Sequence, residues 1–536
     1  MHELDQALSV SNWRGRSGVL ACLIVFPFLG FVVRGQYPLF SVEAVAGLGL
    51  LVATSIAMGL VCRGVVFQAV VLMVSCVSAL VPLQRELARW THVRISVLAV
   101  VLLVGLGLLM WRLKERFYLA VVVFMATLLV GNLFRIGAPA HVVASEWNAG
   151  EGGPPAHFLY LVLDEHMGPG GLPPDIEECH QARTRIERVA WRWGLTLYPN
   201  AYSNYATTFD SLTSALNGRL LPHHLALSPP PDENGIHHLD TTEFRAAAKR
   251  QGYALRFIQL RNVDFTGGNQ ELAFNYDDSI AEAGNMPGGW TDRFKLLVGR
   301  YQASDLVFAR FKGFFPFRFG LRMLYPLSAG RQWPAWLIEE ILAAKRPTLF
   351  FAHILCPHGP YLYKSDGTLR ALREWAHDQD YQRLDQQQYR ARYARYGEQV
   401  QFLQTQLSYL FAELNARGLF EPMTVLVHGD HGSRILVRRD GIAKLDVSGP
   451  AGVDRFDYEG NPDSQDLRDR FSVLFAAKRG GQKIGNTQVT PISLIRVIST
   501  YTGVTPLPEE PSASAAYLFD GAGKPVAIPI RDYWRP

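Results

Sequence analysis

Three hydrophobic stretches of the sequence end in acidic or imidazole side chains. The stretches are LYLVLDEH, LFFAHILCPHGPY and TVLVHGDHG. Their polar residues are Asp164, Glu165 and His166 in the first, His353 and His358 in the second, and Asp430 and His431 in the third. Carboxylates and imidazoles gathered at one place are typical ligands of zinc or manganese. These residue types therefore indicate a divalent-metal site, provided that the fold brings them together.

Each of these residues alone also has an ordinary structural interpretation. An aspartate at the end of a strand is most often the cap of the following helix, and a single histidine is most often a hydrogen-bonded core residue. The pair Asp164-Glu165 is also compatible with a solvated turn. The glycines beside Asp430 and His431 favour the metal interpretation, because glycine permits a sharp turn and the close approach of a ligand.

A dense set of hydroxyl side chains in NAYSNYATTFDSLTSALNGRLLP, residues 200–222, supplies candidate nucleophiles. These are Thr207, Thr208, Ser211, Thr213 and Ser214. A hydroxyl at a helix N-terminus beside a cation is suited to attack, because the cation lowers its pKa and the helix end attracts a phosphate. The alternative is that Thr208 only caps the helix, with Asp210 in the first turn.

Strands and helices alternate in the part of the chain that carries these residues. Short apolar stretches predict strands buried on both faces at residues 157–165, 254–260, 347–355, 423–430 and 470–478. The segment from Gln387 to Arg417 predicts a long helix between two of them. This alternation indicates an α/β domain with a mostly parallel sheet. Because ligands bind at the carboxyl ends of strands in such sheets, the polar residues are expected at one edge.

The N-terminal part of the chain consists of apolar stretches separated by charges. Each has about the length that a bilayer-spanning helix needs, and they lie at about 17–33, 42–61, 64–83, 95–111 and 117–134. A cleaved signal peptide would explain only the first, and buried helices of a soluble protein are the other alternative. We expect a transmembrane domain of about five helices in residues 1–140, a Gly/Pro-rich linker in 141–156, and the α/β domain in 157–536.

Basic side chains are concentrated in this N-terminal part. Residues 1–140 carry 11 Lys/Arg and 5 Asp/Glu, whereas the whole chain has a net charge of +5. The α/β domain therefore lacks the basic excess of a nucleic-acid-binding domain, and no nucleic acid is expected as a partner. The basic residues near the first apolar stretch and between the last two would be cytoplasmic, which places the chain after Phe134 outside. The loop QRELARWTHVR breaks this pattern and is interpreted as a helix lying in the membrane interface.

Two further features bear on the location of the α/β domain. Residues 308–326, FARFKGFFPFRFGLRMLYP, mix phenylalanine with basic residues and contain no acid, which suits an anionic membrane surface. The alternative is a segment packed on the domain with its arginines extended into solvent. Cys179 and Cys356 could form one disulfide if the domain is extracytoplasmic, although two cysteines alone do not show it.

The order of these segments resembles the alkaline phosphatase superfamily, and its sulfatase-like branch in particular. The matching motifs are LDE at 163–165, LNGR at 216–219, PHGP at 357–360 and DHG at 430–432. The nucleophile of that branch lies ten residues before the glycine of Leu-x-Gly-Arg, so its counterpart here is Thr208. The resemblance implies an α/β/α sandwich with a mostly parallel central sheet, here preceded by the five expected transmembrane helices.

The resemblance also implies a role for each site residue. Glu165, Asp430 and His431 would hold a divalent metal, zinc or manganese, with Asp164 as a further ligand; Thr208 would bind it as an alkoxide and act as the nucleophile; His358 and His353 would contact the phosphate or protonate a leaving oxygen. No organic cofactor is implied.

One departure from the hydrolytic sulfatases changes the expected reaction. Their Cys-x-Pro-Ser-Arg stretch carries a cysteine or serine that becomes formylglycine, and Thr208 cannot be converted by that route. A threonine nucleophile behind N-terminal spans is instead similar to lipid A phosphoethanolamine transferases and to lipoteichoic acid synthase, a phosphoglycerol transferase. This likeness implies transfer of a phospholipid head group to an envelope glycan or lipid through a phosphothreonine intermediate. The chain would lie in a bacterial inner membrane, with its catalytic domain on the periplasmic side.

The donor and two alternative functions stay open at this point. The stretch from Thr208 to Ser211 is closer to the phosphoglycerol group, and the few cysteines differ from the several disulfides usual in the phosphoethanolamine group. A sulfatase-like hydrolase or phosphodiesterase would differ only in admitting water as the acceptor. A non-enzymatic membrane scaffold would be favoured by the loss of a ligand or of the nucleophile, and all of them are present.

Overall fold

The computed structural model describes the chain in segments that form two compact units. The described residues are 12–34, 37–73, 95–134, 156–221, 236–260, 263–269, 272–276, 330–371, 386–433, 464–505, 515–519, 525–530 and a few single positions. One unit comprises residues 1–141 with 278–324, and the other comprises residues 142–277 with 325–536. The linker up to residue 155, the loop QRELARWTHVR and the basic aromatic segment 308–326 lie outside the described residues.

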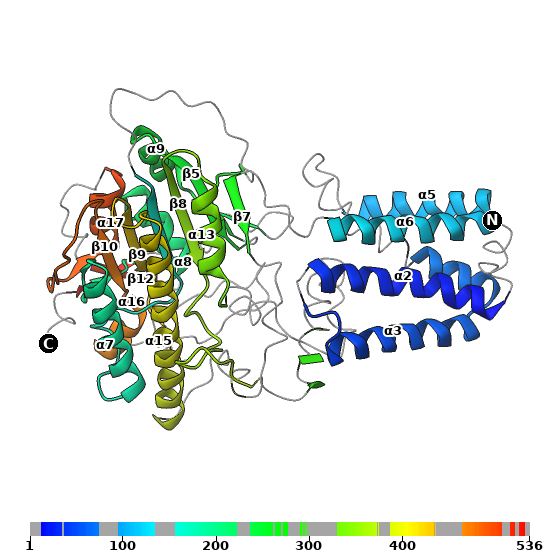
Figure 1. Cartoon of the computed structure of the whole chain (residues 1–536), viewed down its shortest axis with the longest axis horizontal. Coiled ribbons are helices and arrows are strands. Elements are labelled where there is room, and N and C mark those ends of the chain that lie inside the picture. The colour runs from blue at the N-terminus through cyan, green and yellow to red at the C-terminus, as the bar shows by residue number, and fades with distance from the viewer. Residues whose placement is uncertain are drawn as a thin grey trace. The chain divides into compact units, whose positions relative to one another are not determined.

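The second unit is built on a seven-stranded sheet with the order β2-β10-β9-β1-β8-β5-β7 (Figure 1). Its strands are β1 (Phe158–Leu163), β2 (Thr196–Leu197), β5 (Ala254–Gln259), β7 (Ala273–Asn275), β8 (Thr348–Ile354), β9 (Thr424–Gly429) and β10 (Phe475–Lys478). β9, β1, β8, β5 and β7 run parallel, β10 runs antiparallel to β9, and β2 runs antiparallel to β10. The expected α/β domain with a mostly parallel sheet is therefore confirmed.

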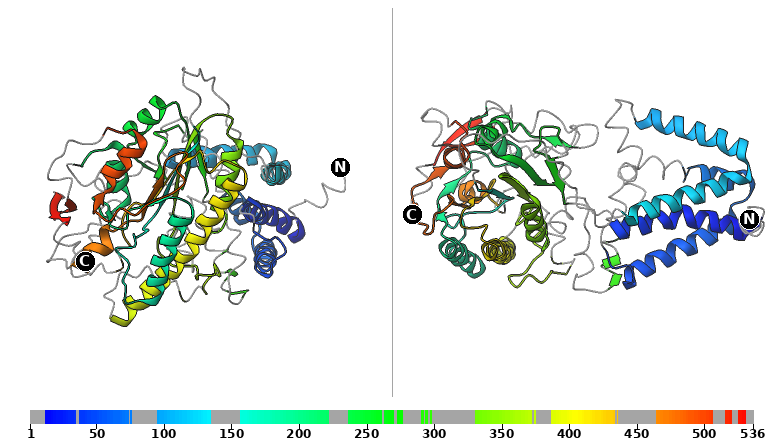
Figure 2. Two further views of the ribbon diagram at one scale, coloured as in Figure 1. Left: turned by 60° about the vertical axis from the view of Figure 1, so that its left-hand side comes forward. Right: turned by 45° about the horizontal axis from the view of Figure 1, so that its top comes forward.

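Helices cover both faces of this sheet. One face packs against α7 (Glu177–Arg192), α13 (Trp333–Ala343) and α15 (Gln386–Ala416), and the other against α8 (Thr208–Asn217), α9 (Thr242–Arg250) and α17 (Leu494–Thr502). Along β1, Leu159, Leu161 and Leu163 enter the first core, whereas Phe158, Tyr160 and Val162 enter the second. This alternation follows from the two-residue period of a strand. The views in Figure 2 show α7 beside α15.

The smaller strands pair outside the main sheet. They are β3 (Ala201–Tyr202) with β11 (Ile492–Ser493), β4 (His237–His238) with β6 (Val263–Asp264), and β12 (Ala515–Phe519) with β13 (Pro525–Pro529). β12 also lies against the loop before α8, where Tyr517 N donates to Asn204 O (2.8 Å). These pairs surround the start of α8.

One predicted strand is wrong in its first part. The stretch 470–478 was expected to be a single strand, but α16 (Ser464–Phe471) occupies its first two residues and β10 begins only at Phe475. Val473 and Leu474 between them are buried, because residues 472–474 cross over the edge of the sheet beside Ala201 and His166. The apolar pattern of residues 472–474 therefore reflects their burial, although these residues do not belong to a strand.

The two cysteines of the α/β unit are unpaired thiols. Cys179 and Cys356 are both buried and free, so the disulfide considered from the sequence does not form. Cys179 Sγ donates to Tyr393 O (3.3 Å). Burial raises the pKa of each thiol to about 12, so both stay protonated.

The first unit contains apolar helices at the expected places. They are α2 (Trp13–Arg34), α3 (Val42–Val61), α5 (Ile95–Leu113) and α6 (Glu115–Phe134), together with a shorter helix at Gly64–Met73. Among the described residues, Trp13–Val33 and Val42–Val61 are long and apolar enough to cross a membrane. Large apolar side chains point outward, such as Val61 of α3 at 80% exposed and Trp111 of α5 at 80%. Such a surface is unusual for a helix bundle in water.

Candidate active site

Parallel strands bring the predicted polar residues to one edge of the sheet. β1 lies between β8 and β9, and the register pairs Leu163, its last residue, with Ile354 of β8 and Gly429 of β9. The residues that follow these strand ends therefore meet. They are Asp164 and Glu165 after β1, His358 after β8, and Asp430 and His431 after β9, while His353 is the penultimate residue of β8.

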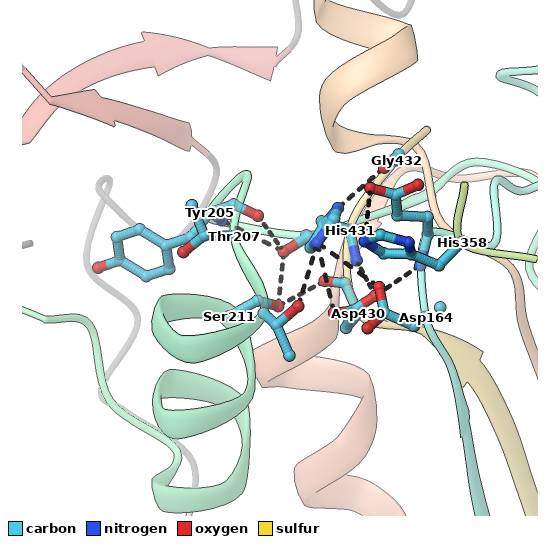
Figure 3. A network of polar contacts seen from close by, with 12 residues as sticks. Asp164, Tyr205, Thr207, Ser211, His358, Asp430, His431 and Gly432 are labelled. Atoms are coloured by element: carbon cyan, nitrogen blue, oxygen red, sulfur yellow. Dashed lines mark hydrogen bonds and ion pairs between the residues drawn. The ribbon is translucent and has the colours of Figure 1, made fainter. Parts of the chain in front are cut away.

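The candidate ligand atoms form two groups that share one carboxylate. Asp164, Glu165 and His358 make one group, and Asp164, Asp430 and His431 make the other; the ligand atoms of each group all lie within 4.8 Å of one another. His431 Nε2 lies 3.4 Å from Asp430 Oδ2 and 3.9 Å from Asp164 Oδ1. His358 Nε2 lies 3.5 Å from Glu165 Oε1. Figure 3 shows His431, His358 and the two aspartates facing one another.

The chemistry of these atoms fits a divalent cation. Among the described residues, Asp164 Oδ1, Asp430 Oδ2 and both ring nitrogens of His353 are buried and make no hydrogen bond. Leaving buried carboxylate oxygens without a partner costs several kcal/mol. A cation held by carboxylates and imidazoles would satisfy them, and this mixed oxygen and nitrogen set suits zinc or manganese.

Hydrogen bonds with backbone atoms orient Nε2 of His431, Nε2 of His358 and Oδ2 of Asp430 toward the cluster of candidate ligands. His431 Nδ1 lies 2.8 Å from Gly432 O, and His358 Nδ1 lies 2.5 Å from Gly359 O. A ring nitrogen facing a carbonyl oxygen must carry the proton, so in each neutral imidazole Nε2 keeps its lone pair for a ligand. Asp430 Oδ1 accepts from Glu165 N and from His431 N, each at 2.9 Å, which leaves Oδ2 for the centre.

The electrostatics of the site favour an ionised Asp430. Burial by itself would raise the pKa of this carboxyl, but the imidazoles of His431 and His353, the hydrogen bond from Glu165 N and the nearby Thr208 hydroxyl outweigh it. The net result is a pKa below the ordinary value for aspartate. Asp430 is therefore a charged oxygen donor at neutral pH.

Thr208 is the hydroxyl that faces the ligands. α8 begins at Thr208, and its N-cap is the preceding Thr207, whose side chain accepts from Asp210 N. The capping role considered for Thr208 thus belongs to Thr207. Thr208 Oγ1 lies 3.3 Å from His431 Nε2.

The other candidate hydroxyls of this stretch form hydrogen bonds within the fold or are buried on α8. Ser211 Oγ donates to Asp430 O (2.5 Å) and lies 2.7 Å from Ser203 Oγ. Ser214 Oγ donates to Arg219 O, and Thr213 is buried on α8. Ser211 therefore ties the nucleophile helix to the turn that carries Asp430, a role that the sequence did not reveal.

The structure thus brings every predicted site residue to this edge of the sheet, but the two histidines of the second stretch, His353 and His358, differ in exposure. His358 keeps 22% of its side chain exposed, whereas His353 keeps 1% and has Nε2 3.4 Å from Asp164 Oδ2. His166, the third polar residue after β1, turns away: its Nε2 is 3.0 Å from Gln404 Nε2, and burial lowers its pKa to about 4.

One comparison with known proteins identifies a family. A family model described as Sulfatase matches residues 179–446, half of the chain. The matched span contains Thr208, His358 and Asp430 but begins after Glu165. No curated protein matches the chain.

Solved structures with a similar chain course include three from different bacteria. The C-terminal periplasmic domain of EptC from Escherichia coli is 11% identical with a TM-score of 0.40, and the match covers 71% of this chain and 94% of that domain. A phosphonate monoester hydrolase from Silicibacter pomeroyi is 13% identical with a TM-score of 0.39, covering 68% and 80%. The lipoteichoic acid synthase LtaP from Listeria monocytogenes is 11% identical with a TM-score of 0.35, covering 66% and 72%.

Proposed function

The chain belongs to the sulfatase family, and from this premise we propose that it transfers a phospholipid head group, phosphoethanolamine or phosphoglycerol, to a glycan or lipid on the outer side of a membrane. The observation that carries this proposal is Thr208 at the start of α8, with Oγ1 3.3 Å from His431 Nε2. Because threonine cannot become formylglycine, its own hydroxyl is the group available for attack. This favours phosphoryl transfer over sulfate-ester hydrolysis.

In the first step, Thr208 Oγ1 attacks the phosphorus of the donor lipid. The Oγ1–P bond forms, the hydroxyl proton passes from Oγ1 through water to His358 Nε2, and the bond between phosphorus and the diacylglycerol oxygen breaks. His358, which is partly exposed and has Nε2 directed at the cluster, would then pass this proton to the departing oxygen. The head group is then held as a phosphothreonine ester.

In the second step, an acceptor hydroxyl attacks the same phosphorus. The bond from phosphorus to Thr208 Oγ1 breaks, the acceptor proton returns to Oγ1, and the head group leaves on the acceptor. The N-terminus of α8 supports both steps, because its free backbone N–H groups favour an anionic phosphoryl group. A divalent cation bound by the ligand groups would lower the pKa of the Thr208 hydroxyl and neutralise phosphoryl charge.

His353 would act through Asp164 rather than on the substrate. Its ring is buried and lies against the Asp164 carboxylate and the ring of Phe265. We therefore assign the direct proton transfer to His358 and a supporting position to His353. Glu165, Asp164, Asp430 and His431 would hold the metal.

The apolar helices of the first unit support a lipid donor. Two of the described helices are long and apolar enough to cross a bacterial inner membrane, and the five spans expected from the sequence would place the catalytic unit on the periplasmic side. A membrane anchor keeps the site where the donor lipid is concentrated. A scaffold without activity would not need a complete cluster of candidate ligands beside the Thr208 hydroxyl.

Mass spectrometry of the peptide that contains Thr208 tests this function. Purified protein is incubated with mixed phospholipids and a divalent metal, and Thr208→Ala protein serves as the control. We expect a phosphoethanolamine or phosphoglycerol adduct on Thr208, which also identifies the donor. Diacylglycerol release without an adduct would favour a hydrolase, and no lipid turnover at all would contradict the proposed donor class.

A further inference from the structure

Helix α15 places a buried polar face against the candidate active site. Tyr393, Tyr396, Gln399 and Gln404 are all buried. Residues three apart on a helix share a face, so Tyr393, Tyr396 and Gln399 follow one another along it. In Figure 1, α15 runs alongside the central strands of the sheet. A buried polar face on a core helix requires hydrogen-bond partners.

Tyr396 holds the turn that carries Glu165. Its hydroxyl donates to Glu165 O (2.8 Å) and accepts from Met167 N (2.7 Å), so one oxygen bridges the two peptide groups on either side of His166. The turn needs this support, because Glu165 has a φ of 61°, in the left-handed region. A residue with a side chain in a sparsely populated backbone region costs about 1–3 kcal/mol.

Gln399 holds the loop that carries His358. Its Oε1 accepts from Leu362 N (2.6 Å) and Tyr363 N (3.1 Å), and its Nε2 donates to Pro357 O (2.9 Å) and to His358 O (3.4 Å). One buried side chain thus uses both its donor and its acceptor groups on a single loop. The same loop meets the Glu165 turn where Gly359 N donates to Glu165 Oε2 (3.3 Å).

α15 is itself fixed against α7. An added Cβ at Gly397 would lie 2.7 Å from Glu178 C and 2.8 Å from Cys179 N, so the helices touch backbone to backbone at this glycine. Tyr396 and Gln399 therefore have little freedom to slide along the site.

We propose that Tyr396 and Gln399 are positioning residues that hold Glu165 and His358 facing each other, so that the site is preorganised for its metal. Glu165 is a proposed metal ligand, and His358 lies in the same group as Glu165 and Asp164, with Nε2 3.5 Å from Glu165 Oε1. Hydrogen-bond partners behind metal ligands typically change metal affinity 10–100-fold when removed. The inference rests on the proposed function of this site, but its test does not depend on the substrate.

The test measures Zn²⁺ affinity of the full-length protein in detergent, with a competing chelator, and in parallel the thermal midpoint of the metal-free protein. Tyr396→Phe removes only the hydroxyl, and Gln399→Met keeps the side-chain length. Gln401→Met is the matched control, because it removes one buried hydrogen bond from the same helix. Gln401 follows Gln399 by two residues, or about 200° of helical rotation, so it lies on a different face of α15. We expect a 10–100-fold weaker affinity for the first two variants and less than a threefold change for the control.

Two results would overturn the inference: unchanged Zn²⁺ affinity in both site variants, or an equal loss in Gln401→Met, which would indicate general destabilisation. If the affinity falls as expected while no phospholipid is turned over by the unsubstituted protein, the positioning role stands and the proposed transferase function fails. If phosphothreonine forms normally and both variants bind Zn²⁺ like the unsubstituted protein, the function stands and the positioning role fails.

Discussion

Thr207 and Thr208 are chemically identical neighbours with different environments in the structure. Thr207 is the N-cap of α8 and accepts from Asp210 N, whereas Thr208 is the first helical residue and faces His431. If α8 began one residue earlier, Thr207 would be the first helical residue and would no longer be the N-cap. Sequence composition alone therefore allowed both nucleophile and cap for Thr208, and only the helix boundary separates them.

Substitution of each threonine by alanine should separate stability from chemistry. Thr208→Ala should abolish turnover and the covalent adduct, while the thermal midpoint stays close to that of the unsubstituted protein. Thr207→Ala should destabilise the protein by about 1 kcal/mol, because a helix cap is lost, and should keep most of the turnover. Adduct yield and thermal unfolding measured on the two variants check this; full activity in Thr208→Ala would disprove the assignment.

The positions of the candidate ligand residues were predictable because these residues lie at strand ends, whereas the residues that support them were not. Asp164, Glu165, Asp430 and His431 follow strands whose apolar patterns are clear, and parallel strands meet at their carboxyl ends. Ser211, Tyr396 and Gln399 act mainly through backbone atoms distant in sequence. Such hydrogen bonds leave no spacing pattern, so a sequence offers no signal for them.

His157 should contribute acid sensitivity that is independent of the active site. It precedes β1 at the opposite end from the ligands, and burial lowers its pKa below the ordinary value for histidine. Its Nδ1 accepts from Thr348 N (3.2 Å), so protonation at that atom would break the bond. Since the unfolded chain then binds more protons, stability is fully present above about pH 6.5 and falls as the pH drops below it.

The thermal midpoint of the α/β unit, recorded in full-length protein between pH 7.5 and 5.5, checks this sign. His157→Asn retains an acceptor near Thr348 N but does not titrate, so its midpoint should fall less with acid. The difference cannot exceed about 1.4 kcal/mol per pH unit, the limit for one proton. A steeper fall in His157→Asn would contradict the prediction.

At the scale of elements, strand positions agreed with the sequence better than strand directions did. β1, β5, β8 and β9 lie within the predicted stretches, and α15 begins and ends one residue before the predicted helix. The antiparallel direction of β10 was not predictable, because an apolar stretch predicts a buried strand but not its direction in the sheet. The connection from β9 to β10 includes α16, and β10 then pairs antiparallel with β9.

Two glycines that follow candidate ligand histidines should differ in their tolerance of alanine. A Cβ on Gly432 would lie 1.9 Å from Asp469 O, in the backbone of α16. A Cβ on Gly359 would meet only ring atoms of Tyr361, at 3.9 Å. The turn after β9 therefore packs directly on α16, and the loop after β8 does not pack so tightly at its glycine.

Gly432→Ala should consequently lower the thermal midpoint by several degrees, because backbone overlap requires a shift of the His431 turn or of α16. The expected destabilisation is about 1–3 kcal/mol, the usual range for overpacking. Gly359→Ala should stay within about 0.5 kcal/mol of the unsubstituted protein. Equal midpoints for the two variants would mean that the turn after β9 can relax freely.

At the scale of the whole molecule, the N-terminal helices expose large apolar side chains, as the proposed membrane location requires. Large apolar side chains of α3 and α5 are exposed, including Leu50 at 57% and Leu108 at 61%. A bundle in water would bury them. Two charged side chains of the described helices are buried: Arg16 of α2, whose Nε donates to Gly59 O, and Glu43 at the start of α3, which pairs with Arg293 of the segment 278–324. Charges of this kind persist in apolar surroundings when they are paired.

Cysteine labelling should show the catalytic unit outside and the α5–α6 connection inside. Trp191 is 81% exposed on α7, and Lys114 is exposed between α5 and α6, so Trp191→Cys and Lys114→Cys report on the two sides. The native Cys179 and Cys356 are buried, and Cys22, Cys62 and Cys76 are replaced by serine in both variants to remove background labelling. In spheroplasts, a membrane-impermeant maleimide should label Trp191→Cys, and should label Lys114→Cys only after permeabilisation. The reverse pattern would place the site on the cytoplasmic side, away from any outer-surface acceptor, and would exclude the proposed transfer.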